Sequence, residues 1–401
     1  MLKYWLWLVT RKGLGARGAW LTARHFASPQ AAYAADIREY QQIEGLRSVE
    51  PLLDKDLSVP ERILRQCYEQ GISLLTVQDA AYPDRLRASN DPPVVLYYKG
   101  ILPDLNGPAI GVVGTRKASV YGLTQARRMG YGLARCGCTV ISGGAKGIDS
   151  EALRGALTGG SPVIAVLGCG VDIVYPYENK ALFRSVEQNG CLISEYPPGT
   201  KPYSGHFPVR NRIISGLSLG VLVVEAPEKS GALITADRAL EQGRDVFVLP
   251  ANVGVDSCSG NLKLLRDGAI PARDAWDILQ EYESRYPGIL SWQPIGDPAG
   301  GEITPGSEPE TEPTKTVDEK KDIDKPKVRA YIDLNEVLDT LNPEEQALAR
   351  LLQDGPKHID ELADQAQTGA SRTLAMLTML EVKGVIQRLS SKVYELKQAE
   401  K

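Results

Sequence analysis

The stretch Gly111-Val112-Val113-Gly114-Thr115-Arg116-Lys117-Ala118-Ser119-Val120-Tyr121-Gly122 decides the fold. It ends an apolar, strand-like run, 109–113, and opens a helix-like segment, 121–136. Glycine lets the backbone turn tightly, so that N–H groups face an anion at the start of the helix. Arg116 adds a forked cation suited to phosphate. The spacing matches neither GxGxxG nor a Walker A loop, and by itself it also fits a tight turn with a surface arginine.

Three later segments repeat this glycine-rich arrangement. Ser142-Gly143-Gly144-Ala145-Lys146-Gly147-Ile148-Asp149 and Gly168-Cys169-Gly170-Val171-Asp172 follow the next strand-like runs, and Ser230-Gly231-Ala232-Leu233-Ile234-Thr235 opens another helix. In an open parallel sheet the carboxyl ends of the strands share one edge, where ligands bind. We therefore predict one shared phosphate-binding surface. Asp149 and Asp172, at the ends of turns, are expected to cap helices or orient the loops.

Apolar runs alternate with helix-length segments throughout the centre of the chain, residues 108–274. The predicted strands are 109–113, 139–142, 162–167, 220–225 and 245–249, and the predicted helices are 121–136, 150–157, 179–189 and 233–242. Strands that are nearly continuous in Val, Ile and Leu are typical of a parallel sheet covered on both faces. The predicted fold class is therefore α/β, a Rossmann-like parallel sheet domain.

The segment Phe207-Pro208-Val209-Arg210-Asn211-Arg212 supplies what an extended polyanion needs. Arg210 and Arg212 are suited to neutralising phosphates, and Phe207 to stacking on a base. Two alternatives stay open from the residues alone. Phe207 is also compatible with a core position, and Arg212 with an internal salt bridge to Glu225 or Asp237.

The two ends of the chain differ from this centre. Residues 1–72 are predicted to form a helical domain whose turns, at 13–15 and 43–46, resemble helix-hairpin-helix or SAM-like turns. Because glycine commonly ends a helix, we favour plain packing turns. The Rossmann-like domain is predicted at 73–290 and a disordered, Pro- and acid-rich linker at 291–332. Residues 333–401 read as a winged helix whose recognition helix carries only Arg372 and Lys383 as cations. We therefore favour a structural or protein-contact role for this domain.

Composition excludes several classes of protein. The chain has 401 residues and a net charge of -4, so nucleic-acid binding requires a local cluster of cations. Its six cysteines and three histidines lack the spacing of a zinc site. The apolar N-terminal run, 1–9, is too short for a signal peptide or a membrane span, so we expect a cytoplasmic protein without membrane contact. No nucleophile motif appears, and we expect neither an enzyme nor a bound cofactor or metal.

The motifs in the segment 71–277 resemble those of the DprA/Smf family of bacterial DNA-processing proteins. The matching motifs include Tyr82-Pro83, Asp91-Pro92-Pro93, Gly114-Thr115-Arg116, Ser142-Gly143-Gly144-Ala145, Gly168-Cys169-Gly170-Val171-Asp172, Phe207-Pro208, Arg210-Asn211-Arg212 and Leu265-Arg266-Asp267-Gly268-Ala269. The resemblance implies a homodimer that binds and protects incoming single-stranded DNA and loads RecA onto it in natural transformation and recombination, without nucleotide hydrolysis. It implies that Arg116 holds a phosphate, that Phe207 meets a base and that the glycine turns cradle the backbone.

One departure from the family pattern concerns the residues before Phe207. A basic residue is expected there, but Ser204 and Gly205 occur, so Lys201 is the candidate replacement. The complete set of predicted DNA-binding residues is Gly114, Thr115, Arg116, Ser119, Gly143, Gly144, Lys146, Gly168, Gly170, Lys201, Phe207, Arg210, Asn211, Arg212, Ser230, Gly231 and Thr235.

Two other functions remain open. The first is a nucleotide-binding or phosphoribohydrolase-like Rossmann enzyme, although the Pro-Gly-Gly-x-Gly-Thr signature of those hydrolases is absent and Glu228-Lys229-Ser230-Gly231-Ala232 stands in the similar place. The second is an architectural protein whose winged helix reads duplex DNA.

Overall fold

The computed structural model describes residues 1–293, 342–352, 355, 357–366, 368, 370–383, 385–388 and 393–396. The chain divides into two compact units, Met1–Pro305 and Gly306–Lys401. Each unit is described by itself. The predicted linker, 291–332, lies outside the described residues from 294 onward.

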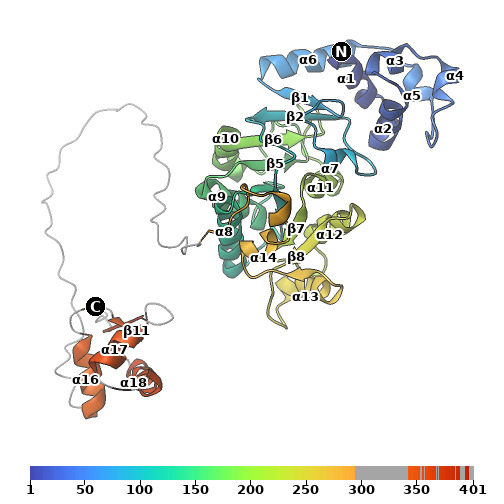
Figure 1. Cartoon of the computed structure of the whole chain (residues 1–401). Helices are drawn as coiled ribbons and strands as arrows, with labels where there is room; N and C mark the ends of the chain where they lie inside the picture. Colours follow the sequence, from blue (N-terminus) through green and yellow to red (C-terminus); the bar gives the residue numbers. More distant parts are fainter. Residues whose placement is uncertain are drawn as a thin grey trace, which may run out of the picture. The chain divides into compact units, whose positions relative to one another are not determined.

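A nine-stranded sheet organises the described part of the first unit (Figure 1), with the strand order β1-β2-β6-β5-β4-β3-β7-β8-β9. The strands are β1 Ser73–Thr76, β2 Val95–Gly100, β3 Ala109–Val113, β4 Thr139–Ser142, β5 Val163–Leu167, β6 Gly190–Ser194, β7 Gly220–Val223, β8 Asp245–Val248 and β9 Ile270–Pro271. Strands β3 to β9 pair in parallel, whereas β2 pairs antiparallel with both β6 and β1. The predicted Rossmann-like sheet is confirmed, with an antiparallel edge added.

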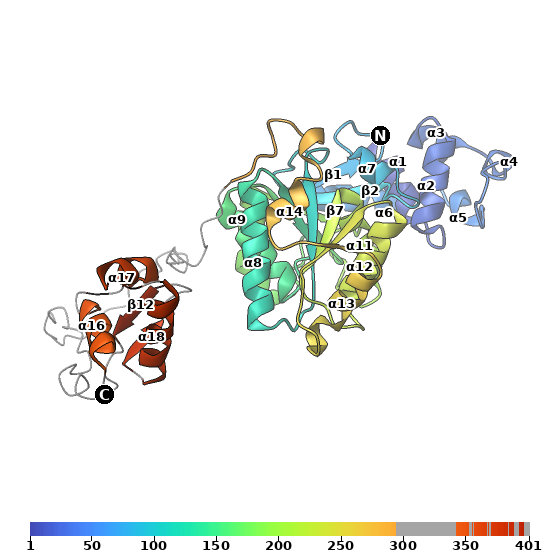
Figure 2. The ribbon, with the colours of Figure 1, turned by 60° about the horizontal axis from the view of Figure 1, so that its bottom comes forward.

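Helices cover both faces of this sheet. Helices α8 to α10 lie on one face, and α11 and α12 on the other (Figure 2). The strands β3, β5, β6 and β7 are buried at every position, which explains why their sequences show no polar alternation. The helices that follow the strands are α8 Val120–Arg135, α9 Ile148–Gly159, α10 Lys180–Asn189, α11 His206–Leu217, α12 Gly231–Glu241, α13 Ser259–Arg266 and α14 Ala275–Leu279, with 3-10 turns at Tyr177–Asn179, Asp256–Cys258 and Glu283–Arg285.

Short helices form the N-terminal part of the same unit. They are α1 Leu2–Thr10, α2 Gly15–His25, α3 Pro29–Ala34, α4 Ile37–Tyr40, α5 Glu50–Leu53 and α6 Ser58–Glu69, and α7 Asp84–Arg87 follows β1. Buried side chains of α1, among them Trp5 and Trp7, belong to one hydrophobic core together with the residues of the sheet. The predicted boundary at 72/73 therefore marks a change of architecture within a shared core. No helix among the described residues is long and apolar enough to cross a membrane.

The second unit has the elements of a winged helix. Its helices are α16 Pro343–Leu351, α17 Ile359–Gln365 and α18 Ala370–Val382, and its strands are β10 Lys357–His358, β11 Ile386–Arg388 and β12 Val393–Leu396. Leu348, Leu362, Leu377 and Tyr394 belong to its core. Of the two cations predicted on the recognition helix, Lys383 lies just beyond α18 and pairs with Glu345 at 2.7 Å.

Candidate functional site

A pocket of about 580 Å³ lies at the carboxyl ends of the central strands. Strands β3 to β6 follow one another in one direction across the sheet, and β7 returns to the other side of β3. Loops after β3 and after β7 therefore diverge at this point, which is where open α/β sheets leave a crevice for ligands. The lining residues are Val113, Gly114, Thr115, Arg116, Lys117, Ala145, Asp149, Tyr175, Pro202, Ser204, Phe207, Pro208, Arg210, Asn211, Ile214, Pro227, Lys229, Ser230, Gly231, Ala232, Ile234 and Thr235.

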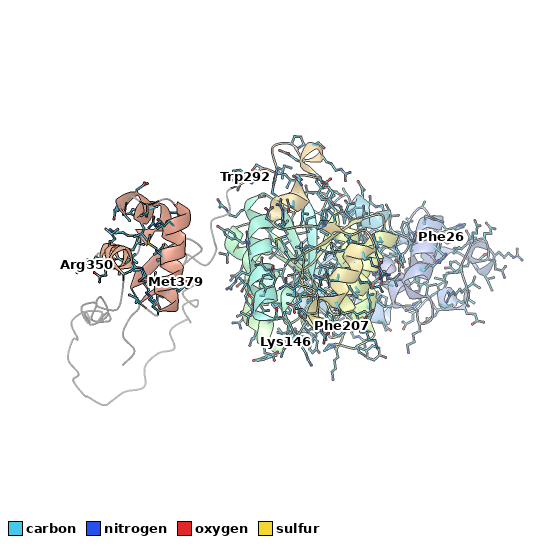
Figure 3. The ribbon with its side chains drawn as sticks, turned by 90° about the horizontal axis from the view of Figure 1, so that it is seen from below. Phe26, Lys146, Phe207, Trp292, Arg350 and Met379 are labelled. Atoms are coloured by element: carbon cyan, nitrogen blue, oxygen red, sulfur yellow. The ribbon has the colours of Figure 1, made fainter. Side chains whose placement is uncertain are left out.

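Helix α11 contributes one face to this pocket. Phe207, Arg210, Asn211 and Ile214 all line it, at the spacing i, i+3, i+4 and i+7 that brings residues to one side of a helix. Figure 3 shows Phe207 at the edge of the domain where Lys146 also lies. The helical conformation thus places the residues of the segment 207–212 on different sides of α11. Arg212, two residues after Arg210, is directed away from the pocket.

Two rings and a guanidinium form the aromatic wall of the pocket. The rings of Phe207 and Tyr175 are stacked with their centroids 5.7 Å apart and an interplanar angle of 28°. The guanidinium of Arg116 lies over the Phe207 ring, 5.2 Å from its centroid, within the range of a cation–π interaction. A Cβ atom at Gly168 would lie only 2.8 Å from Cδ1 of Phe207, so glycine at this position allows the ring to pack against the loop after β5.

Cations dominate the opening of the pocket. Arg116, Lys117 and Lys229 are exposed and line it, and none of the three forms an ion pair with a residue that the structure describes. Asp149 is the one carboxylate among the lining residues. The opening therefore carries a net positive charge, although the whole chain is acidic, as a local anion site requires.

Arg210 and Asp149 form the buried floor of the pocket. Arg210 donates from Nη1 to the Val166 carbonyl at 2.6 Å, and its Nε has no partner among the described residues. Burial lowers the pKa of Arg210 to about 10, so the side chain stays charged at neutral pH. The Asp149 carboxylate accepts hydrogen bonds from the N–H groups of Gly143 and Ala145, at 3.1 and 3.5 Å. Burial raises its pKa, and the nearby Arg210 opposes this shift.

Gly143 makes room for this floor. A Cβ atom there would lie 2.1 Å from Nη1 of Arg210 and 2.6 Å from Oδ2 of Asp149. The expectation that Asp149 orients its loop is confirmed by the two hydrogen bonds from that loop. Asp172 has the same kind of role, because its carboxylate accepts from the Gly199 N–H at 2.9 and 3.0 Å.

The start of helix α8 differs from the prediction. The sequence suggested that N–H groups there face a bound anion, but the carboxylate of Glu225 occupies this place. Glu225 accepts from the Ser119 N–H at 3.1 and 3.2 Å and from the Ser119 hydroxyl at 2.7 Å. The Ser119 oxygen in turn accepts from the Gly122 N–H and caps the helix. The N–H and hydroxyl of Ser119 are thus hydrogen-bonded within the protein, and the carboxylate of Glu225 already supplies the negative charge at the start of the helix.

Arg212 also differs from its predicted role. It is buried, and its Nε donates to Asp91 at 3.1 Å while its Nη2 donates to Glu195 at 2.8 Å. The alternative of an internal salt bridge is therefore correct, with Asp91 and Glu195 as partners instead of Glu225 or Asp237. These acids hold α11 against the loop before β2 and the loop after β6.

The structure brings together part of the predicted set. The predicted residues that line the pocket are Gly114, Thr115, Arg116, Phe207, Arg210, Asn211, Ser230, Gly231 and Thr235. Gly143, Gly144, Gly168 and Gly170 are buried behind it. Lys146 forms an ion pair with Glu178, and Lys201 is exposed but does not line the pocket.

Among the lining residues that were not predicted, three have cationic or aromatic side chains suited to DNA. Lys117 and Lys229 stand next to residues that were predicted, Arg116 and Ser230. Their position inside glycine-rich loops was the available signal. Tyr175 gave no such signal, because its contact with Phe207 joins two loops that are distant in the sequence.

Comparison with known proteins identifies the family. Residues 73–283 match the model of DNA recombination-mediator protein A, and residues 335–392 match the DprA winged helix domain. The chain is 40% identical over 273 residues to Protein Smf of Synechocystis, covering 66% of this chain and 69% of that protein. It is 41% identical over 225 residues to the DNA processing protein DprA of Bacillus subtilis, covering 56% of this chain and 76% of that protein.

A solved structure agrees with this assignment. The X-ray structure of DNA processing protein A from Streptococcus pneumoniae superposes with a TM-score of 0.63 at 33% sequence identity, covering 70% of this chain and 98% of that one. The family model spans more than half of the chain and includes the whole pocket. The chain therefore belongs to the DNA recombination-mediator protein A family.

Proposed function

We propose that the pocket binds single-stranded DNA and that the protein acts as a recombination mediator. The observation that carries this proposal is the position of Arg116 over Phe207, with Lys117 and Lys229 at the same opening. Single-strand binding sites combine cations that follow the backbone with aromatic side chains on which bases stack. The family model, which describes a DNA recombination mediator, supports the same function.

The shape of the pocket favours an unpaired strand. Phe207 is partly buried in a concave site, so a base reaches its ring only if it is not paired within a duplex. Exposed cations at the opening are positioned to neutralise the flanking phosphates. The proposed contacts are therefore a base on Phe207 or Tyr175 and phosphates on Arg116, Lys117 and Lys229.

We propose that the protein holds DNA without reacting with it. Several uncharged polar groups of the pocket are hydrogen-bonded within the protein: the Ser230 hydroxyl accepts from the Ala232 N–H, and Asn211 donates to the Gly231 carbonyl. The Asp149 carboxylate holds its own loop. A nucleotide-hydrolysing enzyme is the competing function, since a site of about 580 Å³ also accommodates a nucleotide. Incubation with nucleoside monophosphates, followed by a search for free base, distinguishes the two.

The remaining parts of the proposal concern partners. We propose that the protein is a homodimer that protects single strands and loads RecA onto them. Exposed apolar side chains on α12, in the loop after β8 and on β9, namely Leu240, Val253, Val255 and Ile270, are available for a contact between copies. Sedimentation of Leu240→Glu tests the dimer, and RecA ATPase activity on a coated strand tests the loading.

Binding of a short labelled oligothymidylate, followed by fluorescence anisotropy, tests the proposed site. We expect Arg116→Ala to weaken binding about tenfold and to reduce the slope of log affinity against log salt by about 0.7. Arg128→Ala, which removes an exposed arginine from α8 outside the pocket, is the matched control. Equal affinity of wild type and Arg116→Ala, or equal binding of single strands and duplex, would contradict the proposal.

A further inference from the structure

A second and larger cleft, of about 930 Å³, lies between the N-terminal helices and the antiparallel edge of the sheet. Its walls come from α1, α2 and α6 on one side and from β2, the loop after β6 and α11 on the other. The lining residues used below are Gly13, Arg62, Tyr97, Glu195, Tyr196 and Val209. The family resemblance and the pocket leave this cleft without a role.

The first turn of α11 separates the cleft from the pocket. Phe207 and Pro208 line the pocket, and the next residue, Val209, lines the cleft, where its side chain is 46% exposed. Aromatic rings continue across this boundary. His206 is stacked on Tyr196 with centroids 4.0 Å apart and an angle of 19°, and Tyr203 meets His206 edge-on at 5.3 Å. Both hollows therefore open onto the same aromatic turn.

The charges around the cleft suit a polyanion. Arg62 lines it, is exposed and has no ion-pair partner among the described residues. Exposed Lys12 and Arg17 flank the turn at Gly13. The acid in the wall, Glu195, forms an ion pair with Arg212.

Two further features of the cleft are suited to binding a polar ligand. Helix α2 begins with no side-chain cap and no acidic residue in its first turn, so the positive end of its dipole is not compensated there. This contrasts with α8, which Ser119 caps and Glu225 neutralises. Tyr97 is among the lining residues of the cleft, and its buried hydroxyl has no hydrogen-bond partner among the described residues. A buried hydroxyl without a partner is costly unless a ligand or water satisfies it.

We infer that the cleft is a second subsite for the same single strand, which passes from the pocket over the first turn of α11 to the N-terminal helices. This inference rests on the proposed function of the pocket and extends it. The strand stacks on Tyr196 and Tyr203 as it crosses the aromatic turn. Its backbone then meets the start of α2 together with Lys12 and Arg62. The N-terminal helices thereby contribute to DNA affinity only when the strand is long enough to reach them.

Binding measurements on short and long strands distinguish the two subsites. We compare the full chain on oligothymidylates of about six nucleotides, near the lower end of common site sizes, and about twenty nucleotides, beyond their upper end. The wild type should bind the longer strand more tightly. Arg62→Glu should weaken binding of the longer strand about tenfold and reduce its salt slope by about 0.7, while leaving the shorter strand unaffected. Arg128→Glu, with the same charge change on α8, should affect neither strand.

Photo-crosslinking gives a measurement that does not depend on a variant. A long strand that carries 5-iodouracil along its length should crosslink to Tyr196 or Tyr203 as well as to Phe207, with each crosslinked residue identified by fragmentation of the peptide in tandem mass spectrometry. Failure of the wild type to bind either strand would overturn the proposed function together with this inference. Binding of the short strand, with no effect of Arg62→Glu on the long one and crosslinks confined to Phe207 and Tyr175, would overturn the second subsite alone and leave the cleft to a protein partner.

Discussion

The guanidinium of Arg116 lies 5.2 Å from the centroid of the Phe207 ring in the free protein. The cation suited to a phosphate and the ring suited to a base are therefore in contact before any ligand arrives. A base that stacks on this side of the ring takes the place of the guanidinium, which then becomes available to the neighbouring phosphate.

Replacing Phe207 should separate stacking from charge. We expect Phe207→Leu to weaken binding of a short single strand by roughly 1–3 kcal/mol with an unchanged salt slope, because no charge is lost. Anisotropy titrations at several salt concentrations measure both quantities. Tyr68→Leu, which removes a ring that is 89% exposed and outside the pocket, should have no effect. A reduced salt slope in Phe207→Leu would show that the ring acts by positioning Arg116 instead of by stacking.

Replacing Arg212 should affect stability. Arg212→Leu leaves Glu195 and Asp91 without their partner near a buried site, and we expect a loss of about 3 kcal/mol in the free energy of unfolding. Urea denaturation measures this loss. Arg238→Leu is the matched control, since Arg238 forms an exposed pair with Glu241 whose loss should cost less than about 1 kcal/mol. Similar losses in the two variants would contradict a structural role for Arg212.

Replacing Glu225 tests how much its carboxylate, which accepts hydrogen bonds from Ser119 at the start of α8, contributes to stability. Glu225→Gln keeps an oxygen for the Ser119 N–H but removes the negative charge at the positive end of the helix. We expect a loss of about 2 kcal/mol in the free energy of unfolding, measured by thermal or urea unfolding. Glu228→Gln changes an exposed carboxylate on the same loop and should be neutral. An unchanged stability of Glu225→Gln would show that the charge is not needed there.

The cysteines should be unreactive in the native protein. All six are buried as free thiols, and burial raises the pKa of Cys67 and Cys169 to about 11 and that of Cys191 to about 12. Because the thiolate is the reactive form, Ellman's reagent at about pH 8 should titrate these thiols only after denaturation. Cys258, with 9% exposure, should react first. Rapid reaction of Cys67, Cys169 or Cys191 without denaturant would contradict their burial.

The sequence predicted the parallel α/β sheet but not all of its strands, and it predicted only part of the candidate site. Strands such as β3 and β4 were predicted with their observed bounds, because apolar runs between glycine-rich turns leave few alternatives. Strand β6 and helix α11 were not predicted. Had α11 been recognised, the spacing of Phe207, Arg210 and Asn211 would have placed these residues on one face and Arg212 on another.

Other features depend on contacts between residues that are far apart in the sequence, which no local sequence pattern predicts. The carboxylate of Glu225 meets Ser119 across 106 positions of the chain, and the Tyr175–Phe207 stack joins two loops. The role of Gly143 as space for Arg210 and Asp149 likewise becomes visible only when three elements meet. The glycine-rich motifs therefore predicted where the pocket lies, but they did not predict which of its polar groups are already hydrogen-bonded within the protein.

The carboxylate of Glu225 at the start of α8 has a consequence for how a strand is released. A phosphate seated on the N–H groups of a helix is held by rigid backbone, and it leaves slowly. Here the carboxylate of Glu225 already occupies that position, so in the proposed function the phosphates are held by the flexible side chains of Arg116, Lys117 and Lys229. Contacts of this kind can break one after another, which would allow a bound strand to be released in steps.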